Sequence, residues 1–442
     1  MTGTDRVAWC APASYLQEQW YRSVEDRRSN YNVVVAWRLL GALDTGALRQ
    51  ALRALVDRHE ILRTGLADRD DGVEQRILAH TEPPLRQIDL GSARDPAAEM
   101  RRLIATDAAH PFALREPPLW RALLARVGPD EHVLALVLHH AVCDGWSSMV
   151  LERDLAALYR ATVTGRAPVL PAVPLQFGDF AAWERAHRDV WREQEWRARL
   201  GPAAGSAVPA LRDLLPFELV CHPVAAVSPA AADRLSALAR QHGATLATLL
   251  YAAALMTLAP ALGEEVVVGI AHANRDDREV QPVVGPVFDY LPVRVALDGC
   301  PALVPLMGRI RREEQAARSR LLPLGLVEQA VGAGPHGALF DVVLNFAPAG
   351  RTPAPAGPVA FTPFPVATDR TRVRVERDFS GAGPLSFVLR RGADGGLGGH
   401  LYGHAGALGR PGLARLGRHF AATLDRLGRD PGYRGPALDL RP

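Results

Sequence analysis

Hydrophobic positions along the chain follow two different periods, and the change from one to the other predicts a mixed α/β protein. Residues 132–138 are a short Val/Leu-rich run behind a Gly-Pro-Asp turn, which is the pattern of a buried strand. Leucines then recur at helical spacing over residues 151–158, behind two serines that can cap a helix. The polar stretch His139–Gly145 therefore lies where a core strand ends and a helix begins.

The same order of elements recurs near the C-terminus. Residues 117–138 predict strand, turn and strand ahead of the first histidines, and residues 384–402 predict the same three elements ahead of His404. An amphipathic helix at residues 412–426 follows this second copy. The repetition predicts two related α/β lobes, of which only the first has an aspartate four residues after its histidine.

The predicted strand limits the chemistry that His139 and His140 can perform. Adjacent strand residues point to opposite faces, so one imidazole is expected to face the core and the two are not expected to bind one metal ion. The Gly-x-Ser-x-Gly turn of a nucleophile-elbow hydrolase is absent from this stretch. What remains is a histidine that acts as a base or hydrogen-bond partner, with Asp144 nearby. The alternative is a core histidine followed by an aspartate that only caps the next helix.

Composition narrows the expected partners and compartment. The 442 residues are 48% hydrophobic and 22% charged with a formal net charge of +3, which favours a globular protein and gives no reason to expect nucleic-acid binding. No apolar run is long enough to span a bilayer, and the four cysteines show no paired spacing. We therefore expect a cytoplasmic monomer with reduced thiols and no membrane contact. All 51 basic side chains are arginine, which excludes a catalytic lysine.

Four segments of the chain carry signatures of one known family. The stretch His139–Gly145 reads His-His-x-x-x-Asp-Gly, and it resembles the active-site signature of the condensation domains of nonribosomal peptide synthetases. Arg58–Thr64 resembles the family's Arg-His-Glu-x-Leu-Arg-Thr almost letter for letter, and Asp179–Trp183 resembles its Asp-Phe-Ala-x-Trp. Residues 269–294 resemble its Ala-Asn-Arg and Leu-Pro-Leu-Arg segments, although Asp289 stands where the family has asparagine.

The resemblance implies a fold of two chloramphenicol-acetyltransferase-like lobes, which form a V-shaped pseudo-dimer with the active site in a tunnel at their interface. The N-terminal lobe, residues 1–190, is expected to carry the histidine motif. The C-terminal lobe, residues 191–442, is expected to carry a floor loop and a latch. A Gly/Pro-rich break at residues 201–205 supports this boundary, and the Pro-rich residues 353–365 are expected to be an ordered crossover or a mobile latch.

The resemblance also implies roles for the residues of the signature. His140 is the expected catalytic residue, as general base or as hydrogen-bond acceptor for the attacking nucleophile. Gly145 is expected to leave room for the substrate arm and to offer its N–H to the developing oxyanion. Asp144 is expected to form a structural ion pair, with Arg275 as the first candidate partner and Arg63 as the second.

The remaining candidates of the site have less specific roles. His139 is expected to be structural. The residues expected to line the substrate tunnel are Trp146, Ser147, Asp289 and Tyr290. No metal ion and no bound cofactor is expected.

The implied reaction is acyl transfer. A donor acyl or aminoacyl group, held as a thioester on the phosphopantetheine arm of a peptidyl or acyl carrier protein, passes to an amine or hydroxyl of an acceptor and forms an amide or ester. The acceptor is either carrier-bound or a free small molecule. The chain shows no adenylation signature and no carrier attachment motif, so we expect a free-standing condensation enzyme; the alternative is one domain excised from a megasynthase. The alternatives are an epimerisation domain, a coenzyme-A-dependent acyltransferase of the same superfamily, and a catalytically silent carrier-protein docking or recruitment module.

Overall fold

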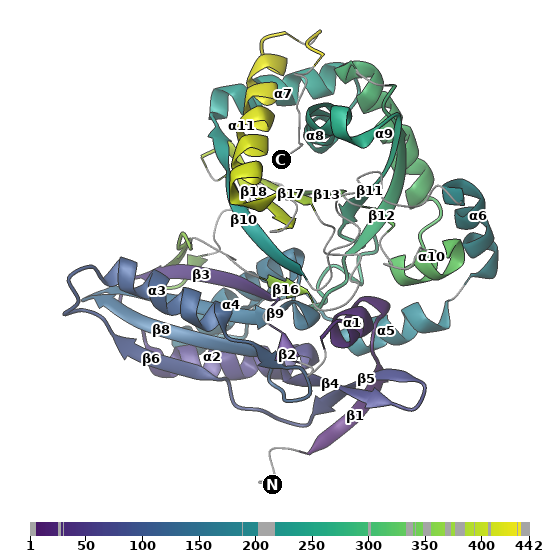
Figure 1. The fold of residues 1–442 in the computed structure, drawn as a ribbon. Coiled ribbons are helices and arrows are strands. Elements are labelled where there is room, and N and C mark those ends of the chain that lie inside the picture. Colours follow the sequence, from purple (N-terminus) through teal and green to yellow (C-terminus); the bar gives the residue numbers. More distant parts are fainter. Residues whose placement is uncertain are drawn as a thin grey trace. The chain divides into compact units, whose positions relative to one another are not determined.

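The strands that the sequence predicts form two large sheets in the computed structural model, one in each of two units (Figure 1). The structure describes residues 6–24, 28–29, 31–187, 189–201, 217–298, 302–332, 339–340, 342–347, 355–366, 373–375, 385–392, 394–404, 408–430 and 432–434. Unit 1 comprises Met1–His187, Ala273–Phe288 and Arg351–Asp369, and unit 2 comprises Arg188–His272, Asp289–Gly350 and Arg370–Pro442.

The division between the units differs from the single boundary at residues 190 and 191 that the sequence predicts. The first crossing of the chain, after His187, lies close to that boundary, but two later segments return to unit 1. Residues 273–288 return because they bond to the start of helix α4 (Gly145–Thr164). Residues 351–369 return because a strand within them pairs with β3 (Asn32–Leu40). The Pro-rich segment expected to be a crossover or latch of the C-terminal lobe therefore belongs to unit 1.

Unit 1 is built on a six-stranded sheet. Its strands, in spatial order, are β14 (Pro355–Ala356), β15 (Val359–Pro363), β3 (Asn32–Leu40), β9 (Glu131–His139), β8 (Trp120–Gly128) and β6 (Leu85–Asp89). Only β6 and β8 are parallel. The Pro-rich stretch predicted as a crossover or latch thus supplies the edge strand β14 and its neighbour β15. Pro355 lies in β14, where a proline is tolerated because one side of the strand forms no ladder bonds.

Helices cover both faces of this sheet (Figure 1). On one face, α3 (Pro96–Ala109) buries Met100 and Ile104 against Val133 and Ala135 of β9. On the other face lie α2 (Thr45–Arg58) and α4 (Gly145–Thr164), which pack on each other. The apolar side chains of β9 are buried on both faces, as predicted for a central strand.

The remaining elements of unit 1 surround this core. They are α1 (Tyr15–Arg22), α5 (Phe177–Ala186), a three-stranded sheet of β1 (Val7–Pro12), β5 (Gly72–Leu78) and β4 (Thr64–Arg69), and the pair β2 (Arg28–Ser29) and β7 (Phe112–Ala113). Two short 3-10 turns, Glu60–Arg63 and His140–Val142, follow α2 and β9.

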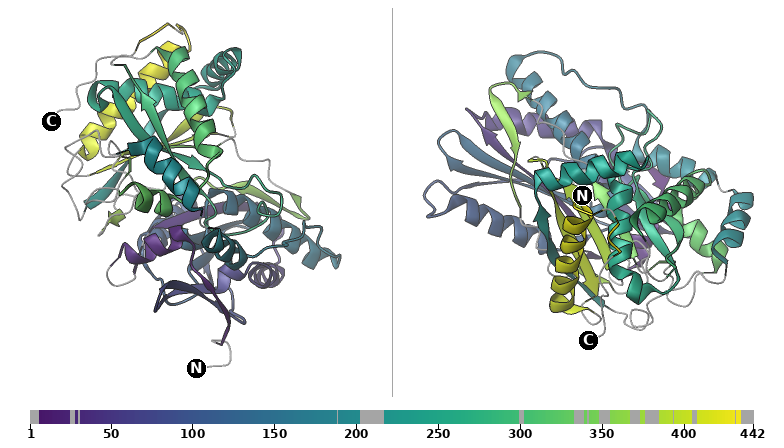
Figure 2. Two further views of the ribbon diagram at one scale, coloured as in Figure 1. Left: turned by 90° about the vertical axis from the view of Figure 1, so that its right-hand side faces the viewer. Right: turned by 90° about the horizontal axis from the view of Figure 1, so that it is seen from above.

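Unit 2 is built on a seven-stranded sheet. Its strands, in spatial order, are β12 (Asp289–Ala296), β11 (Glu265–His272), β13 (Val342–Ala347), β17 (Leu385–Arg391), β18 (Leu397–His404), β10 (Phe217–Val227) and β16 (Val373–Val375). Its helices are α6 (Val190–Leu200), α7 (Pro229–Gln241), α8 (Leu246–Leu262), α9 (Leu303–Arg318), α10 (Leu324–Val331) and α11 (Gly409–Leu427). Helix α11 packs on β10 and β18 (Figure 2) and buries the predicted apolar stripe of Leu413, Leu416, Phe420 and Leu424.

The two large sheets repeat one topology. In unit 1 the order β3-β9-β8-β6 has two antiparallel pairs followed by one parallel pair, and in unit 2 the order β10-β18-β17-β13 has the same directions. A helix follows the corresponding strand in each case: α2 and α7 after β3 and β10, α4 and α11 after β9 and β18. The predicted duplication of an α/β lobe is confirmed.

Within the described part of the chain, no helix has by itself the length and apolar character for crossing a membrane, and α7 with α8 meets that test only as a pair bent by 100°.

Candidate active site

The polar stretch His139–Gly145 forms a corner between β9 and α4, as the sequence predicts. Strand β9 ends at His139, a single 3-10 turn follows, and α4 begins at Gly145. Asp144 caps the helix, because its Oδ1 accepts a hydrogen bond from the Ser147 N–H at 2.6 Å. The side chain of Asp144, a residue of the signature, therefore fixes the point at which α4 begins.

His139 is the histidine that faces the core. Its side chain is fully buried, and its Nδ1 accepts a hydrogen bond from the Ala141 N–H at 3.0 Å. Burial, with a smaller contribution from the neighbouring His140, lowers the pKa of His139 to about 3. A neutral ring that accepts a backbone hydrogen bond holds the turn together, which agrees with the structural role expected for it.

His140 is partly exposed and lies among three aromatic side chains. Its N–H donates to the Tyr31 C=O at 2.8 Å, which continues the pairing of β9 with the chain ahead of β3. The ring centroid of His140 lies 5.0 Å from that of Trp20, 5.2 Å from that of Tyr31 and 5.2 Å from that of Phe288. The alternation expected of a strand therefore separates the two histidines into a core residue and an accessible one.

Helix α1 supports this turn from one side. Gln17 is fully buried and its Nε2 donates to the Ala141 C=O at 2.9 Å. Ser14 and Gln17 also form a reciprocal capping box at the start of α1, which fixes the Gln17 side chain in place. Trp20, one turn further, presents its ring to His140. Sequence reasoning did not assign these residues to the site, and the spacing Ser-x-x-Gln-x-x-Trp was the signal available.

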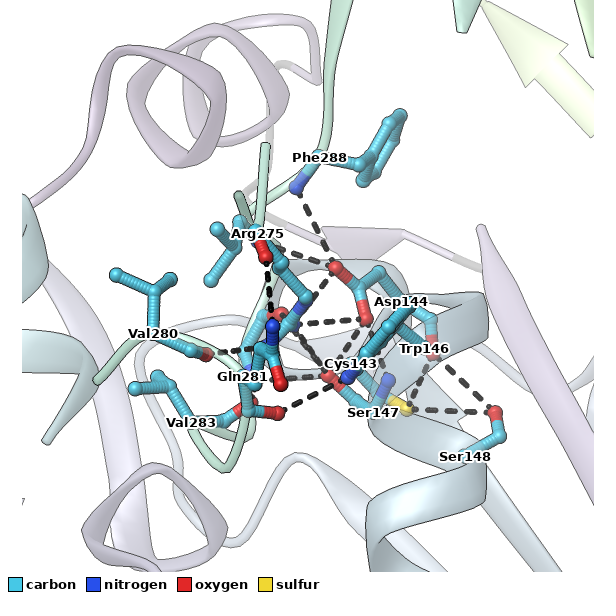
Figure 3. A network of polar contacts seen from close by, with 12 residues as sticks. Cys143, Asp144, Trp146, Ser147, Ser148, Arg275, Val280, Gln281, Val283 and Phe288 are labelled. Atoms are coloured by element: carbon cyan, nitrogen blue, oxygen red, sulfur yellow. Dashed lines mark hydrogen bonds and ion pairs between the residues drawn. The ribbon is translucent and has the colours of Figure 1, made fainter. Parts of the chain in front are cut away.

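Asp144 forms a buried ion pair with Arg275 (Figure 3). Nη2 of Arg275 lies 3.0 Å from Oδ2 and 3.2 Å from Oδ1 of the carboxylate, and the two side chains are 1% and 2% exposed. Nη1 of Arg275 donates to the C=O groups of Val280 and Val283 at 2.9 and 2.6 Å. Of the two predicted partners, Arg275 is therefore the one that the structure places on Asp144.

The second candidate partner, Arg63, lies elsewhere. Its Nη2 is 3.1 Å from Oε1 of Glu60, three residues earlier in the same turn, and its Nη1 lies 3.5 Å from the Leu78 C=O. The expectation that Arg63 belongs to the signature's ion pair is wrong in this structure, because a carboxylate within its own turn and a strand carbonyl occupy its guanidinium.

Further donors complete the coordination of the Asp144 carboxylate (Figure 3). Oδ2 accepts from the N–H groups of Val287 and Phe288 at 3.2 and 3.3 Å. The Ser147 hydroxyl lies 2.6 Å from Oδ1 and accepts from the Gly285 N–H at 3.0 Å. Ser147, expected to line the substrate tunnel, is thus fully buried in this network. The network ties residues 283–288 to the first turn of α4, and a buried charge with this many partners is well compensated.

The next two residues of the signature lie closer to solvent. Gly145 is exposed, and a methyl group added to its Cα would meet no atom within 4 Å. Trp146 is partly exposed, its Nε1 donates to the Gln281 C=O at 2.9 Å, and the Arg275 guanidinium lies 5.9 Å from its ring centroid. The space above Gly145 is open in unit 1, whereas Trp146 packs over the ion pair.

The two other tunnel candidates belong to unit 2. Asp289 accepts from the Tyr290 N–H at 2.8 Å and from the Leu324 N–H at the start of α10 at 2.9 Å. Burial raises the pKa of Asp289 to about 6, although both hydrogen bonds oppose the shift. Tyr290 is buried, with its ring centroid 6.1 Å from that of Phe340. Their place beside a substrate stays a prediction.

The second signature anchors α4 further along its length. Nε of Arg58 lies 2.8 Å and Nε2 of His59 lies 3.0 Å from Oδ2 of Asp154, a fully buried residue of α4. Burial disfavours the Asp154 carboxylate, but hydrogen bonds from His59, Arg153 and Arg58 outweigh it and hold the pKa of Asp154 at about 2. The Arg58–Thr64 signature thus provides a contact between the end of α2 and a fully buried carboxylate of α4.

The corner presents one partly exposed imidazole, and its described residues include no activated nucleophile. Cys143 is buried, and burial raises the pKa of its thiol, so it stays protonated and unreactive. Among the described residues, no three His, Cys, Asp or Glu side chains come together as a metal site requires. His140, with the open space at Gly145 and the rigid Asp144–Arg275 pair behind it, can bind and move a proton for a substrate that brings its own reactive group.

Comparison with known proteins assigns the chain to a family. Residues 9–352 match the Condensation domain family. One of the subunits of the linear gramicidin synthase of Brevibacillus parabrevis is 31% identical over 97% of this chain, and phosphinothricin tripeptide synthetase PhsC of Streptomyces viridochromogenes is 35% identical over 72% of it. The chain spans 8% and 31% of the lengths of these two relatives.

Solved structures share the fold over nearly the whole chain. The X-domain from teicoplanin biosynthesis is 26% identical with a TM-score of 0.79, covering 96% of both chains, and the X-domain in complex with OxyB is 26% identical with a TM-score of 0.75, covering 98% of this chain and 96% of that one. The first condensation domain of the calcium-dependent antibiotic synthetase, in complex with a substrate analogue, is 23% identical with a TM-score of 0.78, covering 97% and 98%. The predicted fold of two chloramphenicol-acetyltransferase-like lobes is confirmed. With this fold and the signature at the β9–α4 corner, the chain belongs to the condensation domain family of nonribosomal peptide synthetases.

Proposed function

We propose that this chain transfers an acyl or aminoacyl group from a carrier-protein thioester to an amine or hydroxyl acceptor, with formation of an amide or ester. The observation that carries the proposal is the pairing of a partly exposed His140 with a buried Asp144–Arg275 ion pair at one strand-to-helix corner. A structure that only caps a helix needs neither the buried arginine nor the accessible imidazole.

The reaction needs one base and no covalent enzyme intermediate. The acceptor nitrogen or oxygen attacks the thioester carbonyl carbon, and His140 takes the proton that the nucleophile loses. When the tetrahedral intermediate collapses, the C–S bond breaks, and the departing sulfur takes that proton from His140 and leaves as a thiol. Because a thioester is already activated, the larger contribution is that of holding donor and acceptor together.

The open space at Gly145 supports the proposal. The absence of a side chain at the first residue of α4 leaves room there for a narrow arm such as phosphopantetheine. The N–H groups of the first helical turn that remain unbonded can donate to the oxygen on which negative charge develops. The chain itself then supplies position, a proton acceptor and hydrogen-bond donors.

Asp144 is proposed to act on structure and not on substrate. Its two carboxylate oxygens are occupied by Arg275, Ser147, Val287 and Phe288, so no lone pair is left exposed for a ligand. Its function is to hold residues 283–288 against the start of α4, and with them Phe288 against His140.

The expected partners are peptidyl or acyl carrier proteins on the donor side, and a carrier-bound or free small molecule on the acceptor side. We further propose that it works in the cytoplasm as a monomer, on substrates that carrier proteins deliver. The phosphopantetheine arm belongs to the carrier and enters as part of the substrate.

The test is a competition between donors and between acceptors. The chain is given equal concentrations of an acyl-carrier protein and the matching acyl-coenzyme A, labelled with different isotopes, together with an amine and an alcohol of similar size. Intact-mass spectrometry then shows which donor loses its acyl group and which acceptor gains it. Preferred use of the carrier supports the proposal, and equal use of free acyl-coenzyme A would favour a coenzyme-A-dependent acyltransferase.

A second candidate function is a silent docking module that binds carriers or other proteins through the same fold. The solved complex of an X-domain with OxyB favours this candidate, because it is a related domain bound to another protein. The accessible His140 and the open space at Gly145 speak against it, since a docking surface requires neither. Carrier binding without any loss of its acyl group would support the docking module.

A further inference from the structure

The side chain of Phe177, the first residue of α5, fills the space at Gly285 in the segment that binds Asp144. The Phe177 ring is fully buried. Gly285 has a φ of +149°, and a Cβ built on it would lie within 3.0 Å of three carbons of this ring. No side chain can approach an aromatic carbon so closely, so only glycine lets the ring rest against the backbone here.

The backbone of Gly285 bonds to the first turn of α4. Its N–H donates to the Ser147 hydroxyl at 3.0 Å, and Ser147 in turn bonds to Asp144. The N–H groups of Val287 and Phe288, the next donors of the segment, lie 3.2 and 3.3 Å from the Asp144 carboxylate. An aromatic ring packed on Gly285 therefore supports the segment at the point from which it reaches the buried ion pair.

Phe177 is itself held in place through Gln176, the residue before it. The Gln176 side chain bonds at both ends to the second signature, since its Nε2 donates to the Arg58 C=O and its Oε1 accepts from the Glu60 N–H, both at 3.1 Å. The Gln176 N–H donates to Oδ2 of Asp179 at 2.8 Å, and Asp179 opens the Asp-Phe-Ala-x-Trp signature. Two signatures of the family thus meet at the residue that precedes the ring.

Helix α4 is reached by these contacts at two places along its length. Further along the helix, Asp154 binds the second signature, and at its start Ser147 binds Gly285. The residues that connect these two anchor points are, in order of contact, Arg58, Gln176 and Phe177. Because the path begins and ends on one helix, a smaller side chain at position 177 leaves residues 283–288 less firmly held against α4.

We propose that Phe177 is a positioning residue of the active site, which holds residues 283–288 against the start of α4 by filling the space at Gly285. The inference rests on the proposed function for its catalytic meaning. Phe177 acts through the segment, which donates two N–H groups to Asp144 and brings the Phe288 ring to 5.2 Å from that of His140. The second signature and the Asp179–Trp183 signature then contribute to the site by fixing the place of this ring.

The test is a double-mutant cycle on Phe177 and Gly285. It is read by hydrogen exchange of the Gly285, Val287 and Phe288 N–H groups, with mass spectrometry on fragments that resolve single residues. Phe177→Leu keeps an apolar side chain and removes the ring, and is expected to speed this exchange about tenfold. Gly285→Ala is expected to speed it at least as much. Because Phe177→Leu makes room for the added methyl group, exchange in the double variant should be slower than the product of the two single effects.

Phe361→Leu is the matched control. Phe361 and Phe177 are both 1% exposed, and Phe361 packs on Trp37 and Tyr159, with ring centroids 6.3 and 6.4 Å apart. The same loss of a buried ring in unit 1 is therefore expected to leave exchange at Gly285 unchanged. Equal acceleration by Phe361→Leu, or independent effects of Phe177→Leu and Gly285→Ala, overturns the inference.

Single-turnover transfer, with the chain in excess over an acyl-carrier protein, tests the catalytic meaning. In Phe177→Leu the rate constant at saturating chain is expected to fall by up to about 100-fold, with an unchanged concentration of chain for half the maximal rate. A role in folding alone would instead raise that concentration and leave the maximal rate constant as it is, which overturns the positioning role. Failure of the proposed function is distinct, because the unsubstituted chain then transfers no acyl group while the exchange results still hold.

Discussion

Two corners of the molecule share one backbone arrangement but carry different side chains. One lies between β9 and α4 in unit 1, and the other lies between β18 and α11 in unit 2. Each is the end of an antiparallel hairpin whose last strand residue is a histidine, His139 in one and His404 in the other, and each leads into a helix on the sheet. Both histidines are buried. The repeated lobe therefore explains the hairpin, the first histidine and the helix, and it does not explain the polar residues between strand and helix in unit 1.

The differences lie in the residues after the strand. In unit 1, Asp144 caps α4 and binds a buried arginine, and a partly exposed His140 lies among the rings of Trp20, Tyr31 and Phe288. In unit 2, α11 starts after Leu408 and no side-chain bond caps it among the described residues, and no aspartate follows His404 before residue 425. The capping aspartate with its buried arginine is therefore a feature that the repeated hairpin and helix do not require, since the described start of α11 has no side-chain cap.

Replacement of the histidine at each corner is expected to give the largest difference in activity between the two corners. His140→Ala is expected to slow transfer to an alcohol acceptor by about 100- to 10,000-fold, because an alcohol needs a base during attack. Transfer to an amine should slow less, since a neutral amine attacks before it loses its proton. His404→Ala should change neither single-turnover rate constant, and a comparable loss in both variants would refute the distinction between the corners.

Removal of the capping aspartate tests whether the ion pair stabilises unit 1. Asp144→Ala is expected to lower the free energy of unfolding by about 3–5 kcal/mol, because it strands the buried Arg275 charge. Asp44→Ala is the control, since the exposed Asp44 caps α2 through the Ala47 N–H alone, and should cost about 1 kcal/mol.

Urea unfolding of these variants measures both losses. A double variant, Asp144→Leu with Arg275→Met, should recover part of the stability, because no unpaired charge remains. Equal losses for Asp144→Ala and Asp44→Ala would mean that Asp144 is only a helix cap.

A methyl group added at the start of α4 tests whether the donor arm passes there, without an expected change in the free energy of unfolding. Gly145→Ala is expected to leave the free energy of unfolding unchanged and to reduce kcat/KM by about 100-fold, because it displaces the donor arm by roughly 1 Å. Gly398→Ala in β18 is the matched control, since a methyl group there also meets no atom within 4 Å. Unchanged kcat/KM in Gly145→Ala would show that the arm does not pass over this residue.

The pH dependence of stability tests the core histidine of unit 1. The folded pKa of His139 is about 3 and its ordinary value is 6.5, so between these values the unfolded state binds the extra proton. Stability should therefore fall with falling pH, by about 1.4 kcal/mol per pH unit below 6.5 from this residue. His139→Asn, which keeps an acceptor for the Ala141 N–H, should remove that slope. Parallel curves for the two proteins would show that His139 is not held neutral.

Much of the site follows from local pattern. The alternation of strand residues separates His139 from His140, and the position of Asp144 ahead of an apolar helix predicts its cap. Arg275 is 131 residues away, and it could be named only because its segment resembles a family signature. The alternation of strand side chains thus predicts the different roles of the two histidines. The partner of Asp144 could be predicted only from the resemblance to the family.

Other parts of the site carry no local signal. Tyr31 and Phe288 look like ordinary core residues in sequence, and their place beside His140 is set by sheet pairing and by the Asp144 network. Ser147 resembled a tunnel residue because it adjoins the signature, yet its hydroxyl is consumed within the network. Arg63 was a reasonable partner by charge, but a nearer carboxylate takes it. Competition between partners is decided by distance, which the sequence does not contain.

The central claim, that the β9–α4 corner performs acyl transfer, is tested most directly by one single-turnover measurement. An acyl-carrier protein is mixed with excess chain and acceptor, and the mass of the carrier and of the acceptor is followed over time. The account predicts that the acyl mass leaves the carrier and appears on the acceptor, and that His140→Ala slows this while the variant still folds. An acyl group that stays on a carrier bound to the unsubstituted chain would contradict it.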